Sequence, residues 1–321
     1  MKVIRESGGE HGDCLMSYVD FESTALEFSE DITLFWGYQT PFNKELISQY
    51  KNDKHKILYQ HEHPSGLHSP HHEGNLLHMN LGEPFDVVYS NCPYTVDWLN
   101  KTHFKSKKYK VGSFVLNEKY VPTEGFQKNK EVCYWGNTFI EKTNVVKDIV
   151  ESISEFNYHY FTLLTDGNVH FARKYATGVN LPRKTLWEAI RECKIMVIQN
   201  LLYLSQPEID GVKRLPDYIK NEAFQHLHTD TIPQIKTRGF EAAFNKTLML
   251  VKKDPWNVIE HWFEPGVDFV YYENESQLKS KIRDILDNWD DYKQIIENAY
   301  NKAVSKYTTK NLIKRIIKEN Y

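Results

Sequence analysis

The sequence of 321 residues is long for one domain and suits two, and its 40% hydrophobic content supports a core in each. Its formal net charge of −3 gives no general attraction to polyanions, so nucleic acid is disfavoured as an obligatory partner. The four cysteines lack the paired spacing of a zinc site or a disulfide framework. The N-terminus turns charged and glycine-rich before any apolar signal region forms, and no run approaches the roughly 18 apolar residues of a membrane span. We therefore expect a cytoplasmic protein without a membrane span.

The first part of the chain alternates short apolar runs with helical patterns. Strands are expected at residues 32–38, 56–60, 85–91 and 110–116, and helices at residues 41–50 and 94–104. Strands separated by helices are typical of parallel βαβ units. The polar segment from Asn117 to Glu131, which contains Pro122 and Gly125, interrupts this alternation and is interpreted as a domain linker.

The alternation resumes after the linker. Strands are expected at residues 132–137, 159–165 and 194–200, helices at 144–156 and 183–193, and only helical spacing follows from Glu275 to the end. The pattern predicts an α/β protein of two Rossmann-like domains, at residues 1–121 and 122–285, followed by helices at 286–321, which we expect to pack back on the first domain. In such folds ligands bind beyond the carboxyl ends of the strands, so an interdomain cleft is the expected site.

Three segments of the second half together resemble a known enzyme family. They are TRGFEAAFNKTLMLV from Thr237, FEPGVDFVYYENESQLKSKIRDIL from Phe263 and AVSKYTTKNLIKRII from Ala303. They look like the C-terminal half of GT-B fold glycosyltransferases, in particular the CgeB-like group, which is similar to glycosyltransferase group 1. Earlier segments, KILYQHEHP, FDVVYSN, VGSFVLNEKYVP and EVCYWGN, fit the same group in order. The resemblance covers roughly residues 55–315 and is strongest from Arg238 onward.

The resemblance implies a glycosyltransferase that moves a sugar from a UDP-sugar or GDP-sugar to an acceptor hydroxyl of a glycan or another small acceptor. Residues 1–121 would then be the acceptor side and residues 122–285 the nucleotide-sugar-binding side. Phosphates need cations or helix amides, and a ribose diol needs a carboxylate acceptor. We expect Glu241 to bind the ribose and Arg238 the diphosphate, with Gly136, Asn137 and Arg183 as weaker donor-site candidates.

Two positions depart from the family pattern. The family usually has glycine five residues after the glutamate, where this sequence has Lys246. We expect Asn245 to adopt the positive φ angle instead, since asparagine tolerates it better than most residues. Retaining families with two glutamates spaced eight apart are not matched, because Pro233 stands eight residues before Glu241. Retention or inversion of stereochemistry therefore stays open.

The loop after residue 60 is rich in histidine and follows an expected strand of the first domain. His61, Glu62 and His63 would face the cleft, where one of them could act as the general base on the acceptor hydroxyl. A polar loop that transfers no proton is an equal alternative. The histidine spacings match no zinc pattern, and a donor held by arginine and helix amides needs no ion, so we expect neither a metal nor another cofactor.

Other functions and roles stay open at this stage. The same donor pocket would serve a nucleotide-sugar epimerase or hydrolase, a binding module without turnover, or a glycosyltransferase that acts on modified DNA bases. Glu241 could be no more than a favourable charge near a helix start with Arg238 solvated beside it, Gly136 an ordinary loop glycine, and Arg183 a solvated cation. The nucleobase, the sugar, the acceptor and the oligomeric state are not encoded in any pattern found.

Overall fold

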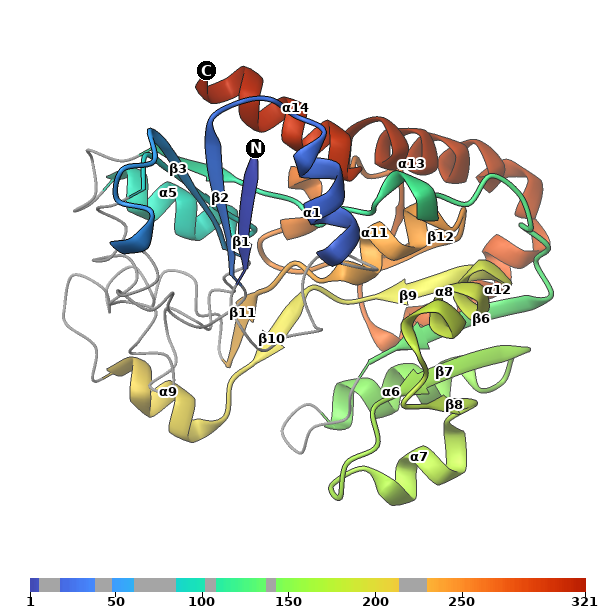
Figure 1. Cartoon of the computed structure of the whole chain (residues 1–321). Helices are drawn as coiled ribbons and strands as arrows, with labels where there is room; N and C mark the ends of the chain where they lie inside the picture. Colours follow the sequence, from blue (N-terminus) through green and yellow to red (C-terminus); the bar gives the residue numbers. More distant parts are fainter. Residues whose placement is uncertain (6–17, 38–47, 61–84, 102–107, 137–142, 214–229) are drawn as a thin grey trace. The chain divides into compact units, whose positions relative to one another are not determined.

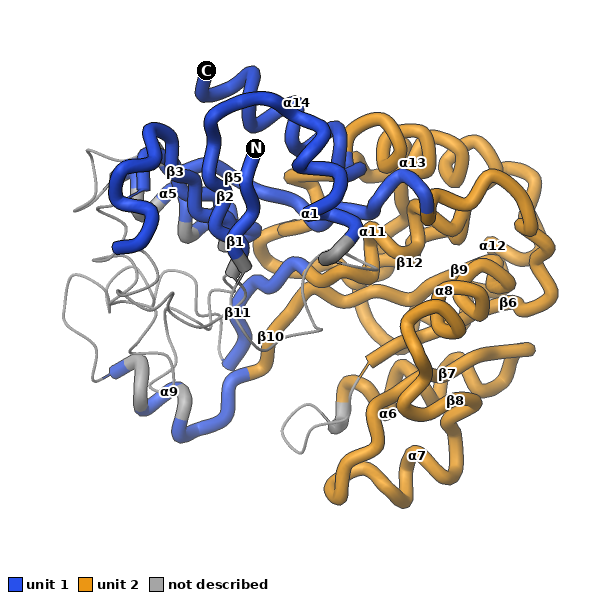
Figure 2. The backbone as a smooth tube through the Cα atoms, viewed as in Figure 1, with its two compact units in different colours: residues 1–119, 204–235, 307–321 blue, residues 120–203, 236–306 orange. Residues whose placement is uncertain are grey.

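The computed structural model describes residues 1–5, 18–37, 48–60, 85–101, 108–136, 143–213 and 230–321. The chain forms two compact units (Figure 2). Unit 1 comprises residues 1–119, 204–235 and 307–321, and unit 2 comprises residues 120–203 and 236–306. The expected boundaries at 121 and 285 divide the chain into consecutive segments, whereas here unit 1 also takes residues 204–235 and the helix that ends the chain. None of the described helices is both long enough and apolar enough to cross a bilayer.

Unit 1 is built on a five-stranded parallel sheet in the order β1-β2-β3-β4-β5. The strands are β1 (Lys2–Arg5), β2 (Ile32–Gly37), β3 (His55–Gln60), β4 (Val87–Ser90) and β5 (Lys108–Val111). The register pairs Leu34 with Ile57, and both side chains are fully buried. The described α-helices of this unit are α1 (Tyr18–Leu26), α5 (Pro93–Lys101), α9 (Gln206–Lys213) and α14 (Thr309–Asn320), and the short strand β11 spans Thr231–Pro233.

Helix α14 belongs to unit 1 and lies alongside α1 (Figure 1). Its residues Leu312, Ile313 and Ile316 recur at helical spacing and are buried in the same core as Phe21 and Ala25 of α1. The expected C-terminal helices therefore separate: α13 (Lys293–Lys306) stays in unit 2 and only α14 packs on the first sheet. The apolar stripe of α14 is the physical reason, because the core of unit 1 buries it.

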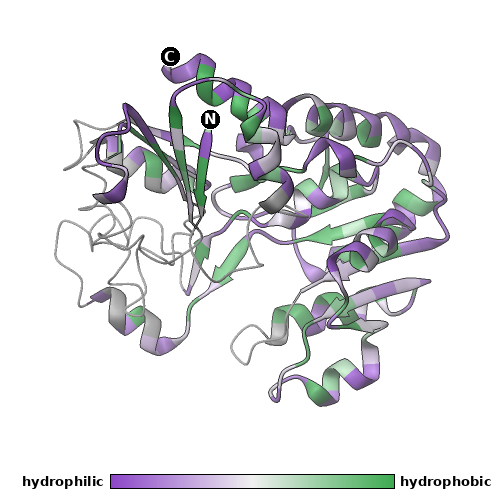
Figure 3. Cartoon of the chain, viewed as in Figure 1, coloured by the Kyte–Doolittle hydropathy of each residue, from purple (hydrophilic) through white to green (hydrophobic). Residues whose placement is uncertain are grey.

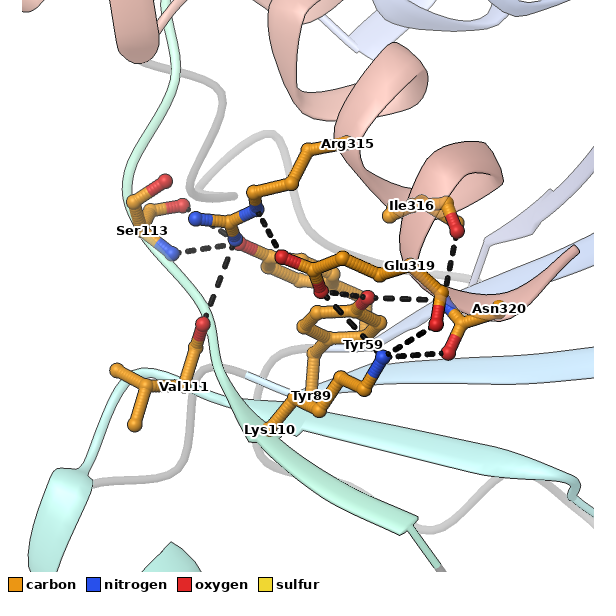
Figure 4. Close-up of polar contacts among 9 residues, drawn as sticks. All are labelled: Tyr59, Tyr89, Lys110, Val111, Ser113, Arg315, Ile316, Glu319 and Asn320. Carbon is orange, nitrogen blue, oxygen red and sulfur yellow. Dashed lines mark hydrogen bonds and ion pairs between the residues drawn. The ribbon is translucent and has the colours of Figure 1, made fainter.

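Polar contacts fasten the end of α14 to the sheet (Figure 4). Asn320 Nδ2 donates to the Tyr89 hydroxyl at 2.9 Å, and this hydroxyl donates to Glu319 Oε2 at 2.9 Å. The Lys110 ammonium donates to Asn320 Oδ1 at 2.8 Å. Burial raises the pKa of Tyr89 well above its usual range, so the phenol stays neutral and donates. These bonds fix α14 in register on β4 and β5.

Unit 2 contains a six-stranded parallel sheet in the order β13-β12-β9-β6-β7-β8. The strands are β6 (Lys130–Trp135), β7 (Tyr158–Thr162), β8 (Gly178–Val179), β9 (Cys193–Ile198), β12 (Leu248–Lys252) and β13 (Val270–Tyr272), and β10 (Leu201–Tyr203) lies outside this sheet. Numbered in chain order within the sheet, the strands run 3-2-1-4-5-6, the doubly wound order of dinucleotide-binding domains. The order reverses between β6 and β9, and ligands of this fold bind beyond the carboxyl ends at that point.

Helices cover both faces of the unit 2 sheet. On one face, α6 (Thr143–Ile153) and α12 (Glu275–Asp287) bury apolar stripes against residues such as Val132, Ile195 and Leu248. The alternate residue Met249 lies on the opposite face, where Gly239 of α11 (Thr237–Phe244) approaches it. That face also carries α8 (Arg183–Arg191) and α13, and the remaining helix is α7 (Val169–Tyr175). Strand β9, in the middle of this sheet, is coloured mainly as hydrophobic in Figure 3, as expected for a strand buried on both faces.

The expected fold class, a protein of two parallel α/β units, is confirmed. In unit 2, each of the expected strands at 132–137, 159–165 and 194–200 overlaps an observed strand, and the two expected helices overlap α6 and α8. The linker prediction extends too far, because β6 already begins at Lys130, whereas the division between the units falls at Lys119. Apolar periodicity located these elements because each one buries a whole face.

Candidate functional site in unit 2

Gly136 follows the last residue of β6, at the point where the strand order reverses. A Cβ atom at this position would lie 2.7 Å from the Tyr134 hydroxyl, so only glycine fits there without displacing the tyrosine. Its N–H donates to the Phe161 carbonyl at 3.0 Å, and its carbonyl accepts from the Tyr160 hydroxyl at 3.3 Å. Glycine is therefore required because the Tyr134 side chain lies too close for a Cβ atom, and the two hydrogen bonds hold the backbone in place at the end of this strand.

Glu241 lies in the second turn of α11 and is completely buried. Its Oε1 accepts from Arg183 Nη1 at 2.8 Å, whereas its Oε2 is buried without a hydrogen-bond donor among the described residues. The Arg183 side chain is 34% exposed, so one side of the pair reaches solvent. The helix begins at Thr237, before Arg238, so the carboxylate that we expected near the helix start lies in the second turn, and its neighbours Phe240 and Ala242 are buried with it.

Arg238 lies one turn earlier on the same helix. Its guanidinium carbon is 5.2 Å from the centre of the Trp135 ring and 5.8 Å from that of Tyr134, which is cation–π distance. Its Nε and Nη1 are buried and have no hydrogen-bond acceptor among the described residues. Two buried donors without acceptors are costly unless a ligand or water satisfies them. The arginine is thus held at the end of β6 with donors available for an anion.

Two amide residues at the end of β9, Gln199 and Asn200, were not singled out from the sequence. Gln199 Nε2 donates to the Tyr134 hydroxyl at 3.3 Å, and Asn200 Oδ1 accepts from the Lys236 N–H at 3.3 Å. Gln199 Oε1 and Asn200 Nδ2 are buried without partners among the described residues. Their signal in the sequence was a polar pair directly after the apolar residues of KIMVI, at the end of an expected strand.

The turn after α11 corrects one expectation. Asn245 has a φ angle of −94°, and the positive φ of 49° falls on Lys246, the position where the family usually has glycine. Asn245 instead donates from Nδ2 to the Glu241 carbonyl at 2.9 Å and closes the helix with its side chain. Lys246 pays the steric cost of a left-handed conformation, but its ammonium is 2.7 Å from Glu297 Oε1 and 4.6 Å from the centre of the Tyr300 ring.

The remaining candidates lie outside the described residues: Asn137 beside Gly136, and His61, Glu62 and His63 in the histidine-rich loop. Their roles stay predictions. Within the described part of the chain, no group of three or more histidine, cysteine, aspartate or glutamate residues is arranged to hold a metal ion. The structure does bring together Arg183 and Glu241, which are 58 residues apart in the sequence. It also places Arg238 against the ring of Trp135, which directly precedes Gly136.

This arrangement has a definite chemical capacity. Guanidinium groups bind phosphate or carboxylate oxygens in bidentate geometry, and a buried carboxylate oxygen accepts hydrogen bonds from hydroxyl groups. Arg238 Nε and Nη1 and Glu241 Oε2 leave both kinds of atom without partners among the described residues. They lie at the strand-order reversal, where a doubly wound sheet receives its ligand. A ligand that carries both negative charge and hydroxyl groups fits these atoms.

Comparison with known proteins assigns this part of the chain to a family. A family model described as glycosyl transferase-like matches residues 147–318, more than half of the chain and including Arg183, Arg238 and Glu241. None of the curated proteins searched matches the sequence.

Solved structures share the fold at low sequence identity. One is Anabaena HepE in complex with UDP and glucose, with a TM-score of 0.62, 12% identity and 99% of each chain covered. Another is the pneumococcal O-GlcNAc transferase GtfA in complex with UDP and GlcNAc, with a TM-score of 0.56 and 11% identity, where 95% of this chain covers 59% of that one. A third is sucrose-phosphate synthase from Thermosynechococcus elongatus, with a TM-score of 0.59, 9% identity and coverage of 94% and 76%.

Proposed function

Because the chain belongs to the glycosyl transferase-like family, we propose that it transfers a sugar from a nucleoside diphosphate sugar to an acceptor hydroxyl. The observation that carries the proposal is the set of buried atoms without partners on Arg238 and Glu241, at the strand-order reversal of a doubly wound sheet. The CgeB-like group stays a resemblance within this family.

Each donor-site residue has a role that its surroundings support. Glu241 Oε2 accepts from the ribose hydroxyls, because it is a buried acceptor without a donor among the described residues. Arg238 binds the diphosphate through Nε and Nη1 and stabilises the charge that develops as the diphosphate leaves. Arg183 holds the carboxylate of Glu241 in place and adds positive charge at the start of α8. Gly136 allows the backbone at the end of β6 to lie close to the ligand, and Asn137, which is outside the described residues, stays a predicted donor-site residue.

The donor is proposed to be a UDP-sugar first and a GDP-sugar second. HepE and GtfA, which share the fold, were each crystallised with UDP. We also propose binding without a divalent ion, since two guanidinium groups supply positive charge for the phosphates.

We propose a cytoplasmic location because the three described cysteines, Cys92, Cys133 and Cys193, are all buried free thiols.

On the acceptor side, we retain the proposal that His61, Glu62 or His63 removes the proton from the acceptor hydroxyl. A general base contributes typically about 10²–10⁴-fold to the rate and acts on the acceptor, not on the donor. Alanine at the true base should therefore lower turnover within that range while donor affinity stays the same. Turnover within a factor of about three for all three variants would place the base elsewhere.

The proposed function is tested by screening UDP, GDP and their sugars for thermal stabilisation, and then by following donor consumption. A ligand at about 100 times its dissociation constant stabilises by about 2.7 kcal/mol. A transferase consumes its donor only when a glycan or another hydroxyl acceptor is present. Consumption without an acceptor would indicate a hydrolase or epimerase instead, and binding without consumption in any acceptor mixture a non-catalytic module. Loss of activity with EDTA, restored by a divalent ion, would overturn the metal-free proposal.

A further inference from the structure

The ammonium of Lys128 lies where two helices of unit 2 end. Its Nζ donates to the Arg191 carbonyl at 2.8 Å, to the Asn245 carbonyl at 3.1 Å and to the Thr247 hydroxyl at 3.2 Å. Arg191 is the last residue of α8, and Asn245 directly follows α11. Carbonyls at a helix C-terminus lack partners within the helix and carry partial negative charge, so a cation there satisfies and attracts them.

Further hydrogen bonds join the same two helix ends. The Thr247 hydroxyl donates to the Ile190 carbonyl of α8 at 3.0 Å. Arg191 Nε donates to Asn245 Oδ1 at 3.3 Å, and Asn245 Nδ2 donates to the Glu241 carbonyl within α11 at 2.9 Å. A continuous path of hydrogen bonds therefore runs from Lys128 to the backbone of Glu241.

The same helices carry the donor-site residues: Arg183 and Arg238 lie near the other ends, and Glu241 lies in the middle of α11. Helix α8 starts with Arg183, and α11 has Arg238 as its second residue. Both helices lead into neighbouring parallel strands, β9 and β12, so their starts lie at the carboxyl edge of the sheet and their ends at the amino edge. A helix of nine residues is about 13 Å long and stiff, so a shift at its end displaces its start.

We propose that Lys128 is a positioning residue for donor binding, which holds the ends of α8 and α11 together and so sets the geometry of Arg183, Arg238 and Glu241. This inference rests on the proposed function. Lys128 does not touch the ligand site; it acts through the two helices that form it.

The charge of Lys128 makes the inference testable by pH. The pKa of Lys128 is lowered to about 8, chiefly by burial; the neighbouring cations Arg191 and Lys246 also lower it, while Cys193 and Cys133 act in the opposite direction. Above this pKa the amine is neutral and its hydrogen bonds to the helix carbonyls weaken. Donor affinity should therefore fall as the pH rises through about 8. By linkage, the bound nucleotide should raise the pKa of Lys128 and binding should take up protons near that pH.

The experiment measures UDP affinity of the full chain by calorimetry from about pH 7 to about pH 9.5, on either side of the Lys128 pKa. Lys128→Met should weaken UDP binding about tenfold at pH 7, the equivalent of roughly one charge-assisted hydrogen bond. Lys128→Arg keeps the charge at every pH used, so it should bind UDP at pH 7 and lose both the pH-dependent decline and the proton uptake. The matched control is Lys130→Met, because Lys130 is on the same segment and, among the described residues, its ammonium donates only to Asn157 Oδ1, at 2.9 Å.

Amide hydrogen exchange supplies a readout without ligand. At one fixed pH, Lys128→Met should accelerate exchange in α8 and α11, and Lys130→Met should not. Any one of three results would overturn the inference alone. These are a UDP affinity of the unchanged chain that does not vary with pH, the same decline of affinity with pH in Lys128→Arg, and an unchanged UDP affinity in a folded Lys128→Met variant. If the unchanged chain binds no nucleoside diphosphate, the proposed function falls and this inference falls with it. If Lys128→Met does not fold, the pH dependence of UDP affinity in Lys128→Arg, compared with that of the unchanged chain, tests the inference.

Discussion

Arg183 and Glu241 form an ion pair of 2.8 Å between α8 and α11 in which only the arginine reaches solvent: the side chains are 34% and 0% exposed. This asymmetry matters because a buried charge without a partner costs far more than one that can hydrate. The Glu241 carboxylate therefore needs Arg183 as a partner more than Arg183 needs Glu241. Removal of Arg183 and removal of Glu241 should lower the free energy of unfolding by different amounts.

We expect Arg183→Gln to destabilise the protein by about 3–5 kcal/mol, because it leaves the Glu241 carboxylate buried and unpaired. Glu241→Gln should cost only about 1–2 kcal/mol, since the guanidinium that remains can turn to water. Urea unfolding of both variants measures the difference. The double variant should be less destabilised than Arg183→Gln alone. Equal costs, or a larger cost for Glu241→Gln, would contradict the burial of the carboxylate as the cause.

Removal of Arg238 should weaken nucleotide binding more than it weakens the fold. Its unpartnered donors contribute nothing to stability until a ligand accepts them, so Arg238→Ala should raise the dissociation constant for UDP by about ten- to a hundredfold. Arg238→Lys should recover only part of the affinity, because an ammonium cannot form the bidentate contacts. Arg173→Ala is the matched control, since Arg173 is an exposed residue of α7. An equal loss of affinity in the control would show a general charge effect instead of a specific contact.

Lys246 allows a test of backbone strain against side-chain contacts. Lys246→Ala and Lys246→Gly both remove the ion pair with Glu297, but only glycine adopts the positive φ of 49° without steric cost. The glycine variant should therefore be more stable than the alanine variant by about 1 kcal/mol. Thermal or urea unfolding of the two variants checks this order. A more stable alanine variant would mean that the turn relaxes to another conformation.

The conformation of this turn could not be predicted correctly from the sequence alone. Asparagine tolerates positive φ, which is why the sequence alone assigned that conformation to Asn245. In the structure the Asn245 side chain donates to the Glu241 carbonyl and accepts from Arg191, and the φ angle of Asn245 is −94°. A local propensity was thus outweighed by a contact with a residue 54 positions away.

The elements of unit 2 were predictable to the extent that each buries a regular apolar face. Strands β6, β7 and β9 and helices α6 and α8 fall within or overlap the expected ranges, because periodicity records burial. Strand β8 has only two residues and carries no periodicity, so it was missed. The resemblance directed attention to Arg238 and Glu241, but their burial and the pairing with Arg183 are tertiary facts that no local pattern contains.

The pH dependence of stability provides the last prediction, at Asp254. Burial raises the pKa of this carboxyl from its ordinary 3.8 to about 6, although its Oδ1 accepts from the Trp256 N–H at 2.9 Å. The folded state therefore holds the proton more tightly than the unfolded state. Stability from this group is fully present below about pH 4 and is lost as the pH rises through about 6. The full loss is about 3 kcal/mol, from a shift of roughly two pKa units.

Asp254→Asn stays neutral at every pH, so it should become more stable relative to the unchanged chain as the pH rises from about 4 to about 7. Urea unfolding of both proteins across this range isolates the contribution of Asp254, because all other groups titrate in both. Asp290→Asn is the opposite control: Lys293 lowers the pKa of the exposed Asp290, so its stabilising contribution is present above its ordinary pKa and is lost as the pH falls. Were the difference between Asp254→Asn and the unchanged chain to stay constant with pH, or to shrink as the pH rises, the carboxyl of Asp254 would not be titrating in a buried environment.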